Sequence, residues 1–582
     1  MFDRNTIIAL VFVGLILLFM PTYMKWLNPP PPTPPTETIV EPVKPRETPD
    51  KSVIVAQETA TRTPDSSFTP QGSFTDSVPA RPYNPELVTI ETPKFRLIVG
   101  SDGRPSGYIL KNYNLKNGPP VNLHTMASGR DSALGTWDLD FGPRSFTSLR
   151  SFHFESNRRG LNISSGLDSL ELVSTDPQGR RMSLYYIVDA ERYGFDLNIQ
   201  ATGFQPTETR EAKLTWQGGV PSTEPDPASD HEFGGTYALI GEELENHALG
   251  SDPKVEFSAT GRTPFVATRS KYFMAALIPV APGVGADLLG RTRNPQDKTQ
   301  PHFYDAGLRL PWESATFDQR VQVYWGPIIK KNLEAYNVGL ENTMNWGWTI
   351  VKPFSLSVLW LLQQMGKILH NYGVVIIIFS IIVKVLLWPL TRKSQIAMKK
   401  MAALKPELEA LKEKHAKNPQ ALNAAMMQLY KDRGANPAAG CIPMILQMPI
   451  LYGLFIVFRS TIEFRQAPFM GWISDLSQPD FLFHLPFTIP LYGAGVGLLP
   501  IVVGVSQYFM SKATLTDPNQ KAMLYIMPFM MVFLFNNFPS GLSLYYTLFN
   551  VWAIVEQRLI KLPTDFAPAV VVEDKPRKKP KK

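Results

Sequence analysis

Apolar residues gather at two places in the 582-residue chain, at its amino terminus and after about residue 345, and the stretch between them is polar and rich in turns. The run from Ile7 to Met20 continues through Pro21 to Leu27 and so reaches the roughly 20 residues that a bilayer core requires. No small-residue cleavage site follows it. The pattern therefore predicts an uncleaved signal-anchor helix over 1–27, followed by a Pro-rich extended tether over 28–85 that forms no packed core.

Between 86 and 330 the apolar positions alternate with polar ones. Phe195, Leu197 and Ile199 follow this period of two, and so do Val321 and Val323. Such a period is typical of strands that bury one face. Gly, Pro, Asn and Asp turns recur throughout the segment. We therefore expect a large antiparallel β-sandwich.

After Pro327 the period becomes helical. The segment 345–371 is amphipathic and is expected to lie along the membrane interface, although a spanning helix is the alternative. Long apolar runs predict membrane spans near 372–390, 441–459, 489–509, 522–538 and 541–558. Together with the anchor these runs predict a polytopic α-helical membrane protein of six transmembrane helices with a large β-domain outside the membrane.

Charge sets the expected topology. The net charge of +7 would suit nucleic acid, a ribosome or anionic lipid, and its positive residues concentrate in the loop 391–440 and in the basic tail 559–582. The positive-inside rule places both segments in the cytoplasm and the loop 461–486 outside, so both termini are expected to be cytoplasmic. A single cysteine, Cys441, excludes an internal disulfide and a thiol-bound metal cluster.

The basic loop 391–440 is predicted to fold as a cytoplasmic helical hairpin. Its two apolar stripes follow helical spacing and consist of Met401, Leu404, Leu408 and Leu411, then Leu422, Met426 and Leu429. Pro406 should kink or restart the first helix, Asn418 should cap the second, and Gly434 should end it. A cationic hairpin suits contact with ribosomal RNA or a nascent chain, whereas the alternative is a solvated face that only orients the protein.

Lys384 is the sharpest single feature, because it lies within the apolar stretch Ile376 to Leu387, where an ammonium costs about 2.5 to 3.5 kcal/mol. Two explanations stay open. About 9 Å of helix separates it from the cytoplasmic end, a distance that a snorkelling lysine partly covers. Alternatively it lines a wet cavity open to the cytoplasm, an interpretation favoured by Ser380 one turn earlier and by Gln447 in the next span.

Other polar residues in the apolar runs are expected to be interfacial or interhelical packing groups: Gln507, Asn536, Asn537, Tyr545, Tyr546, Asn550 and Glu556. Gly493 and Gly497 have the small-residue spacing of close helix packing. The chain has neither a phosphate-binding loop nor a zinc-protease signature. His231 and Glu232 could form an acid/base pair, but an adjacent pair in a loop is more often a surface feature. We therefore expect no catalytic residue, no metal and no cofactor.

Several short motifs occur in a fixed order over about 200 residues around the helical hairpin: Pro389-Leu390-Thr391, Asn436-Pro437, Gly440-Cys441-Ile442-Pro443, Gln447-Met448-Pro449-Ile450, Phe538-Pro539-Ser540-Gly541-Leu542 and Tyr545-Tyr546. Together they resemble the YidC/Oxa/Alb family of membrane-protein insertases. Further upstream, three motifs resemble the long form found in Gram-negative bacteria: Asp3-Arg4-Asn5, Ser270-Lys271-Tyr272-Phe273 and Gly347-Trp348. The similarity thus covers nearly the whole chain.

The resemblance implies a five-helix insertase core over 372–558, whose hydrophilic groove opens to the cytoplasm and lipid but is closed outside, and a periplasmic β-supersandwich. It implies insertion and folding of integral membrane proteins in the bacterial inner membrane, alone or with the Sec translocon, without an enzymatic reaction or a small-molecule substrate. Lys384 stands where the family has a groove arginine, so the charge is kept and the planar five-donor fork is not. The other predicted groove residues are Ser380, Gln447, Tyr545 and Tyr546.

The expected partners are nascent membrane proteins, the Sec translocon, the ribosome with its targeting machinery, and membrane lipids. Contacts with the ribosome or targeting machinery are predicted for Lys399, Lys400, Lys412, Lys414, Lys578 and Lys579. A transporter is disfavoured, because the long basic loop has no counterpart that an inverted repeat would require. A sugar-binding or sugar-processing β-domain is the third interpretation, and deleting about residues 90–320 would abolish such an activity while sparing an insertase core.

Overall fold

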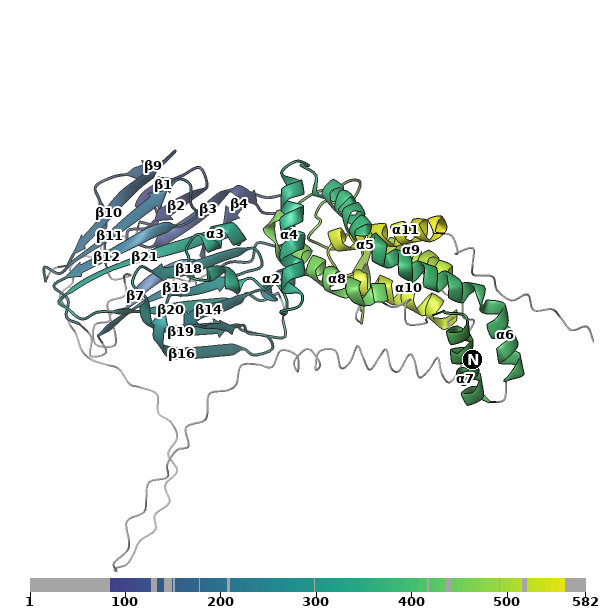
Figure 1. The fold of residues 1–582 in the computed structure, drawn as a ribbon. Helices are drawn as coiled ribbons and strands as arrows, with labels where there is room; N and C mark the ends of the chain where they lie inside the picture. The colour runs from purple at the N-terminus through teal and green to yellow at the C-terminus, as the bar shows by residue number, and fades with distance from the viewer. Residues whose placement is uncertain are drawn as a thin grey trace, which may run out of the picture. The chain divides into compact units, whose positions relative to one another are not determined.

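The computed structural model describes residues 84–560 except 127–132, 141–148, 150–151, 177, 207–209, 298, 416–417, 436–441, 491 and 515–520. These residues belong to one compact unit, which begins with a β-rich domain and continues as a helical region (Figure 1). The predicted anchor over 1–27 lies outside the described residues, as do Cys441 and nearly all of the tether and of the basic tail.

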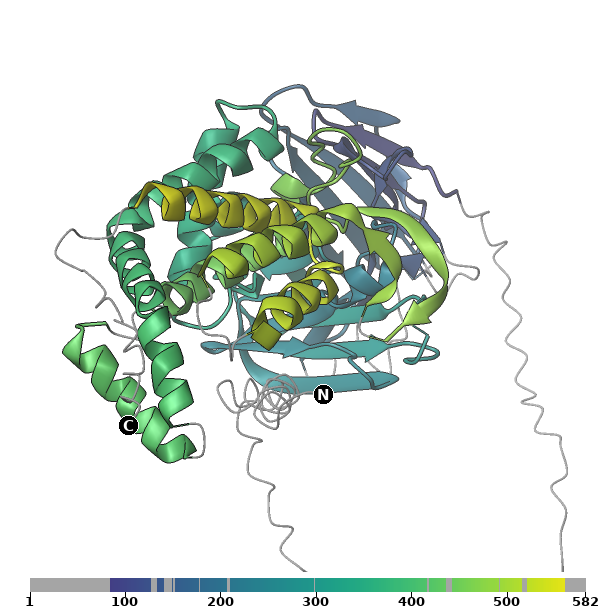
Figure 2. The ribbon, with the colours of Figure 1, turned by 90° about the vertical axis from the view of Figure 1, so that its right-hand side faces the viewer.

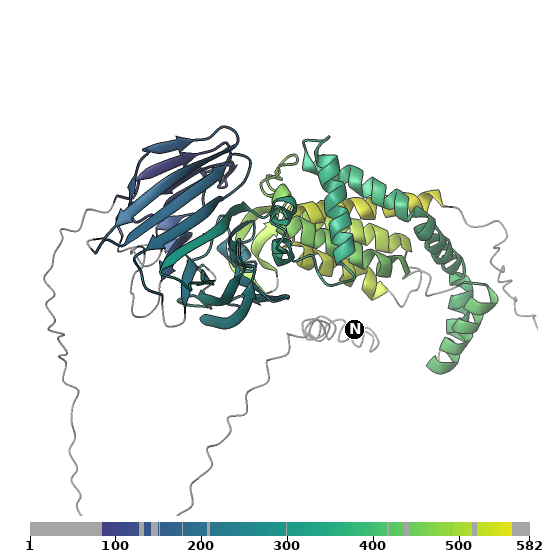
Figure 3. The same ribbon diagram turned by 60° about the vertical axis from the view of Figure 1, so that its left-hand side comes forward.

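Three large sheets build the β-domain (Figure 3). A five-stranded sheet has the order β4 (Pro120–Asn122), β3 (Pro105–Asn114), β2 (Phe95–Val99), β1 (Val88–Glu91) and β9 (Gly160–Asn162). A nine-stranded sheet has the order β15 (Glu243–His247), β14 (Gly235–Ile240), β17 (Phe265–Arg269), β18 (Phe273–Pro279), β21 (Thr316–Pro327), β12 (Phe195–Thr202), β11 (Arg181–Asp189), β10 (Leu167–Thr175) and β8 (Glu155–Ser156). A second five-stranded sheet has the order β16 (Lys254–Thr263), β19 (Gly283–Arg291), β20 (Phe303–Pro311), β13 (Glu211–Gln217) and β7 (Thr136–Asp140). The short strands β5 (Thr125–Met126) and β6 (Ala133–Leu134) pair with each other.

One strand pair departs from the antiparallel arrangement that the sequence predicts. β9 pairs with β1 in parallel, with Ile90 opposite Leu161. The chain leaves the nine-stranded sheet after β8, adds β9 to the edge of the first sheet and returns as β10. The predicted antiparallel β-domain therefore contains one parallel pair, at this edge, because the crossing between sheets brings β9 in with the direction of β1.

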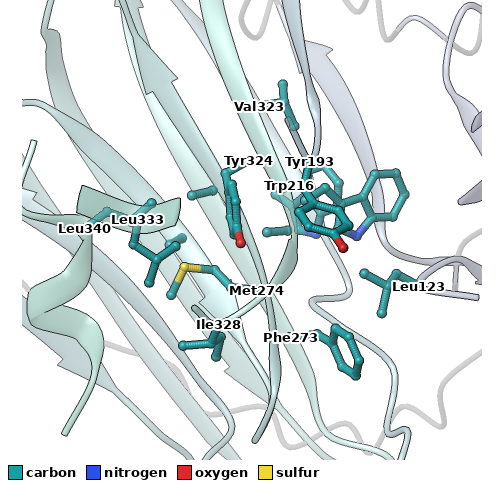
Figure 4. Close-up of a cluster of buried hydrophobic side chains, with 14 of the residues drawn as sticks. Leu123, Tyr193, Trp216, Phe273, Met274, Val323, Tyr324, Ile328, Leu333 and Leu340 are labelled. Atoms are coloured by element: carbon teal, nitrogen blue, oxygen red, sulfur yellow. The ribbon is translucent and has the colours of Figure 1, made fainter. Parts of the chain in front are cut away.

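The β-domain has its core between the sheets, as the period of two predicts. Leu197, Ile199 and Val321 are completely buried. Figure 4 shows Trp216 and Tyr324 among the buried apolar side chains. Such close packing of large aromatic rings contributes strongly to a hydrophobic core. A domain with this core needs no disulfide to hold it together.

The helical region has six longer helices outside the helical hairpin's own α6 and α7, counted over the described residues: α4 (Lys352–Gly366), α5 (Tyr372–Ala403), α8 (Ile442–Ser460), α9 (Leu498–Thr514), α10 (Lys521–Phe535) and α11 (Ser540–Leu559). Short turns of helix are α2 (Pro227–His231), α3 (Lys330–Glu334), η3 (Leu340–Thr343) and η5 (Ile462–Phe464). Within the described part of the chain, Tyr372–Pro389 is the one helical stretch whose length and composition alone suffice for a membrane span. The predicted spans near 441–459, 522–538 and 541–558 also correspond to helices (α8, α10 and α11) but stay predictions as membrane crossings.

The predicted span at 489–509 is wrong in its first half. Residues up to Gly497 form a two-stranded β-ribbon of β22 (Phe481–Ile489) and β23 (Gly493–Gly497), and helix begins only at Leu498. Pro490 cannot donate a helical hydrogen bond, and Gly493 has a φ of 92°, which a right-handed helix does not allow. The apolar composition of this segment therefore does not measure the length of a helix, and the helix-packing role predicted for Gly493 and Gly497 falls with it.

The helical hairpin forms as its stop and start signals predict (Figure 1). α5 ends at Ala403, α6 (Lys405–Lys414) restarts with Pro406 in its first turn, and α7 (Pro419–Asp432) is capped by Asn418, whose side chain accepts from the backbone N–H of Ala421 at 3.1 Å. Gly434 follows with a φ of 59°. An Arg433–Glu407 ion pair at 3.1 Å and a small buried cluster of Leu404, Leu408, Tyr430 and Ala435 join the two helices.

A buried ion pair fastens the segment after α8 to the β-domain. Arg465 Nε donates to Glu224 Oε1 at 2.7 Å, and the two side chains are 3% and 1% exposed. Gln466 Nε2 donates to the carbonyl oxygen of Asn114 at 3.0 Å. Burial raises the pKa of Glu224, and the charge of Arg465 opposes that rise. This end of the helical region therefore lies against the β-domain.

Candidate functional site

The buried ammonium of Lys384 has a specific partner. Lys384 on α5 lies 2.7 Å from Glu556 Oε2 on α11, and the side chains of the two residues are only 11% and 5% exposed. The Thr391 hydroxyl, two turns after Lys384, donates to Glu556 Oε1 at 2.7 Å. The Lys384 ammonium also lies 4.7 Å from the centre of the Phe549 ring. One carboxylate therefore connects the two charged or polar side chains of α5 to α11.

This pair changes the choice between snorkelling and a wet cavity. A cation with a carboxylate at contact distance does not need to reach the cytoplasmic surface, so snorkelling is not required. Moving two charges out of water remains costly, and removal of either partner leaves the other buried without compensation. In this structure Lys384 therefore already has an acidic partner within the protein.

The other predicted groove residues lie on three helices. Ser380 on α5 is buried and donates to the carbonyl oxygen of Ile377 at 2.6 Å. Gln447 lies on α8, and Tyr545 and Tyr546 lie on α11. The hydroxyl of Tyr546 donates to Gln507 Oε1 on α9 at 3.4 Å. Among the described contacts, none joins Lys384 to these four residues, so their common role stays a prediction.

Several buried polar atoms in this region have no hydrogen-bond partner among the described residues: Gln447 Nε2, Tyr545 Oη, Thr547 Oγ1 and Asn550 Oδ1. Buried polar groups are almost always bonded to protein or to water. A cavity of about 510 Å³ lies between α9 and α11, and Ser506 and Thr547 contribute to its lining. Its lining includes none of the five predicted groove residues.

The predicted ribosome contacts differ in their surroundings. Lys399 donates to the carbonyl oxygen of Ile560, at the carboxyl end of α11, and is therefore occupied within the protein. Lys414 is exposed on α6, while Lys400 and Lys412 are half-buried. Lys578 and Lys579 lie outside the described residues. A positive side chain at a helix carboxyl terminus is favourable, so Lys399 has a structural role.

The sequence analysis places Glu556 among the interfacial or interhelical groups, and the structure shows it between α5 and α11, but its pairing with Lys384 is not predicted. The sequence does contain a signal for this pairing, namely one acidic and one basic residue in two different apolar helices. Burying either charge costs far less free energy when the two residues pair. Thr391 was noted only as part of a motif. Which helices are neighbours, however, does not follow from one sequence.

His231 and Glu232, whose adjacency in the sequence is more typical of a surface feature than of an acid/base pair, each contact another residue in the structure. Glu232 makes an ion pair with Arg459, and the His231 ring stacks on His302 with 4.0 Å between ring centres. Burial, followed by the neighbouring charge of His231, lowers the pKa of His302 from 6.5 to about 4. The arrangement is a packed histidine pair rather than a catalytic one.

We expect the free energy of unfolding to fall as the pH drops from about 6.5 toward 4. In that range the unfolded chain binds a proton at His302 while the folded chain does not. Above pH 6.5 neither form binds this proton, so His302 no longer lowers the free energy of unfolding. The His302→Gln variant should lose less stability over this interval than the unaltered chain. Thermal unfolding of the full chain in detergent, followed at several pH values, measures the difference, and identical pH profiles would contradict the prediction.

Comparisons with known proteins agree with this architecture. Residues 87–356 match the family described as YidC periplasmic domain, and residues 364–565 match the family described as 60Kd inner membrane protein. A relative from Chloroherpeton thalassium, named Membrane protein insertase YidC, is 33% identical over 602 residues that cover 100% of this chain and 99% of the relative. A relative of the same name from Chlorobaculum parvum is 31% identical and covers 96% of this chain and 94% of that protein.

A solved structure titled "Active YidC insertase crystal structure with the first transmembrane domain resolved" is 17% identical, with a TM-score of 0.34, and the match covers 81% of this chain and 93% of that chain. The sequence matches confirm the predicted family, the insertase function and the assignment to a class of proteins that are not enzymes. They also confirm a β-rich periplasmic domain and an inner-membrane location. The chain therefore belongs to the YidC family of membrane protein insertases.

Proposed function

We propose that this insertase receives its clients at the Lys384–Glu556 pair, with Lys384 as the attracting charge and Glu556 as its resting counter-ion. The observation that carries the proposal is the 2.7 Å contact between their charged groups, buried between two apolar helices. An acidic residue in the exported tail of a client takes the place of Glu556 beside the ammonium. Because one ion pair is exchanged for another, the client carboxylate avoids most of the desolvation cost of entering the membrane.

The ion pair between Glu556 and Lys384 can break and form again during each insertion. The second oxygen of Glu556 keeps the hydrogen bond from the Thr391 hydroxyl when the ammonium turns to a client. The carboxylate is therefore never left without a donor, which lowers the cost of the exchange. When the client leaves sideways into lipid, Glu556 pairs with Lys384 again and the resting state is restored.

The proposed groove opens to the cytoplasm and to lipid, and it contains water. The unpartnered polar atoms of Gln447, Tyr545, Thr547 and Asn550 favour hydration of this region, because such atoms otherwise pay a large burial cost. Ser380 and Tyr546 belong to the same proposed groove. A client segment of about 20 apolar residues then gains enough transfer free energy in lipid to insert without ATP.

The proposed topology has six transmembrane helices, counting the anchor at 1–27, with both termini in the cytoplasm and the segment 345–371 along the interface. The helical hairpin supports this orientation, because its cations favour the cytoplasmic side. Nascent membrane proteins are the proposed clients. The Sec translocon, the ribosome with its targeting machinery, and lipids are the other proposed partners, with exposed Lys414 as the best-placed contact on the hairpin.

Site-specific photocrosslinking tests the groove. A photoreactive residue replaces Gln447, Tyr546 or, as a matched control, Leu386, which is 73% exposed on α5 only two positions after Lys384. The probe chain is a ribosome-stalled single-span client with an acidic exported tail. We expect adducts with the client from positions 447 and 546 and mainly lipid adducts from position 386. Equal client yields from all three positions would show that clients do not use this groove.

A further inference from the structure

The β22–β23 ribbon exposes more large apolar side chains than its place at the end of a folded domain explains. Figure 2 shows it in lime as a curved pair of strands. On β22, Leu482, Phe483 and Phe487 are 51%, 54% and 60% exposed. The sequence from Phe481 to Gly497 contains no Asp, Glu, Lys or Arg. A soluble loop rarely presents a continuous apolar surface of this kind, and such surfaces mark contacts with proteins or membranes.

Hydrogen bonds fix the ribbon at the ends of the helices. The Asp480 carboxylate, just before β22, accepts from the backbone N–H of Leu499 at 2.8 Å in the first turn of α9. Asn536, in the turn between α10 and α11, donates to the carbonyl oxygens of Tyr492 and Gly495 at 3.0 and 2.8 Å and accepts from the N–H of Gly497 at 3.1 Å. The ribbon therefore lies where one helix begins and another pair turns.

The ribbon lies at the end of the helical region that contacts the β-domain, and a periplasmic β-domain puts that end at the outer surface of the membrane. The segment after α8 lies at the same end of the helical region, because Trp472 Nε1 donates to Asp480 at 3.0 Å. That segment also carries the Arg465–Glu224 ion pair to the β-domain, which belongs to the periplasmic family. Aromatic residues are favoured at this depth of a bilayer. Trp472 itself is 47% exposed beside the ribbon.

Two features favour lipid over a protein partner. Exposed apolar side chains also occur on α9, which follows β23 directly in the chain: Ile501 and Val505 are 42% and 51% exposed and one helical turn apart. Pro486 lies in the middle of β22, and a proline on an edge strand prevents the regular addition of another strand. The ribbon is thus poorly suited to pairing with a second chain but continuous with a helix face suited to lipid.

We propose that the β22–β23 ribbon inserts into the outer leaflet of the inner membrane, with Leu482, Phe483 and Phe487 at the boundary between headgroups and acyl chains. The occupant of this surface is phospholipid. The inference concerns anchoring and does not depend on how clients use Lys384. The β22–β23 ribbon then anchors the protein at the membrane interface, where the sequence pattern predicts the first turns of a spanning helix.

Depth-dependent fluorescence quenching tests the proposal in the full chain. Starting from Cys441→Ser, the single substitutions Phe483→Cys and Phe487→Cys each carry a polarity-sensitive fluorophore in vesicles of phosphatidylethanolamine and phosphatidylglycerol. The matched control is Leu167→Cys on β10, which is 67% exposed in the β-domain. The quenchers are a phospholipid with a nitroxide near the top of its acyl chain and acrylamide present on both sides of the membrane.

Nitroxide lipid should reduce the emission at positions 483 and 487 at least twofold more than at position 167, and acrylamide should show the reverse order. Adding Phe487→Asp to the Phe483→Cys variant should shift quenching at 483 toward acrylamide, since a carboxylate disfavours this depth. Thermal unfolding of each labelled variant confirms that it is folded. Quenching at 483 by acrylamide alone would place the ribbon in water and overturn the proposal. Resistance to both quenchers would indicate a protein contact and overturn it as well.

Discussion

Lys384→Ala is expected to abolish most insertion of a single-span client with an acidic exported tail, by about tenfold or more, because the attracting charge is lost. It should also lower the free energy of unfolding by about 3–5 kcal/mol, since Glu556 is left buried without its counter-ion. Lys384→Arg, which keeps the positive charge, should retain insertion. Membrane-protected fragments of the client after protease treatment measure the activity, and thermal unfolding measures the stability.

The double variant Lys384→Ala with Glu556→Gln separates the two effects. An amide at position 556 can still accept the hydrogen bond from Thr391, so stability should recover while insertion should not. Full insertion by either alanine variant would show that the charge at position 384 does not act on clients. Recovery of insertion together with stability would mean that the charge matters only for folding.

Arg465→Met is expected to lower the free energy of unfolding by about 3–5 kcal/mol, because Glu224 then lies buried without its counter-ion between the β-domain and the segment after α8. Burial already raises the pKa of Glu224, and removal of the arginine raises it further. The deficit should therefore shrink as the pH is lowered, since protonation removes the uncompensated charge. Thermal unfolding of the full chain at several pH values measures both effects.

Arg459→Met is the matched control. The Arg459–Glu232 pair joins the same two parts of the chain, but Arg459 is 34% exposed and Glu232 is 56% exposed. Exposed pairs contribute at most about 1 kcal/mol. Equal losses for Arg459→Met and Arg465→Met would contradict the assignment of a special role to the buried pair.

Local signals in the sequence predict local structure well in this chain. Pro406, Asn418 and Gly434 act on the backbone within a few residues, and the helical hairpin ends and restarts where they predict. The alternation around Leu197 likewise follows from burial of one face of a strand. Such features are fixed by neighbours in sequence, so a single chain is enough to find them.

Features that depend on distant segments are not predicted. The pairing of Lys384 with Glu556 requires α5 and α11 to be neighbours, although 172 positions separate the two residues in the numbering (556 minus 384). The parallel placement of β9 depends on a crossing between two sheets. At the β22–β23 ribbon, apolar composition suggested a membrane helix, whereas the local backbone of Pro490 and Gly493 selected strands.

The continuity of α5 has a mechanical consequence. The helix runs without interruption from Tyr372 to Ala403, and its 32 residues, at about 1.5 Å each, form a rod of roughly 48 Å. Pro389 lies inside this helix and does not end it. The cation at position 384 and the first part of the basic loop, from Thr391 to Ala403, thus lie on one continuous helix, so a tilt of this helix moves both.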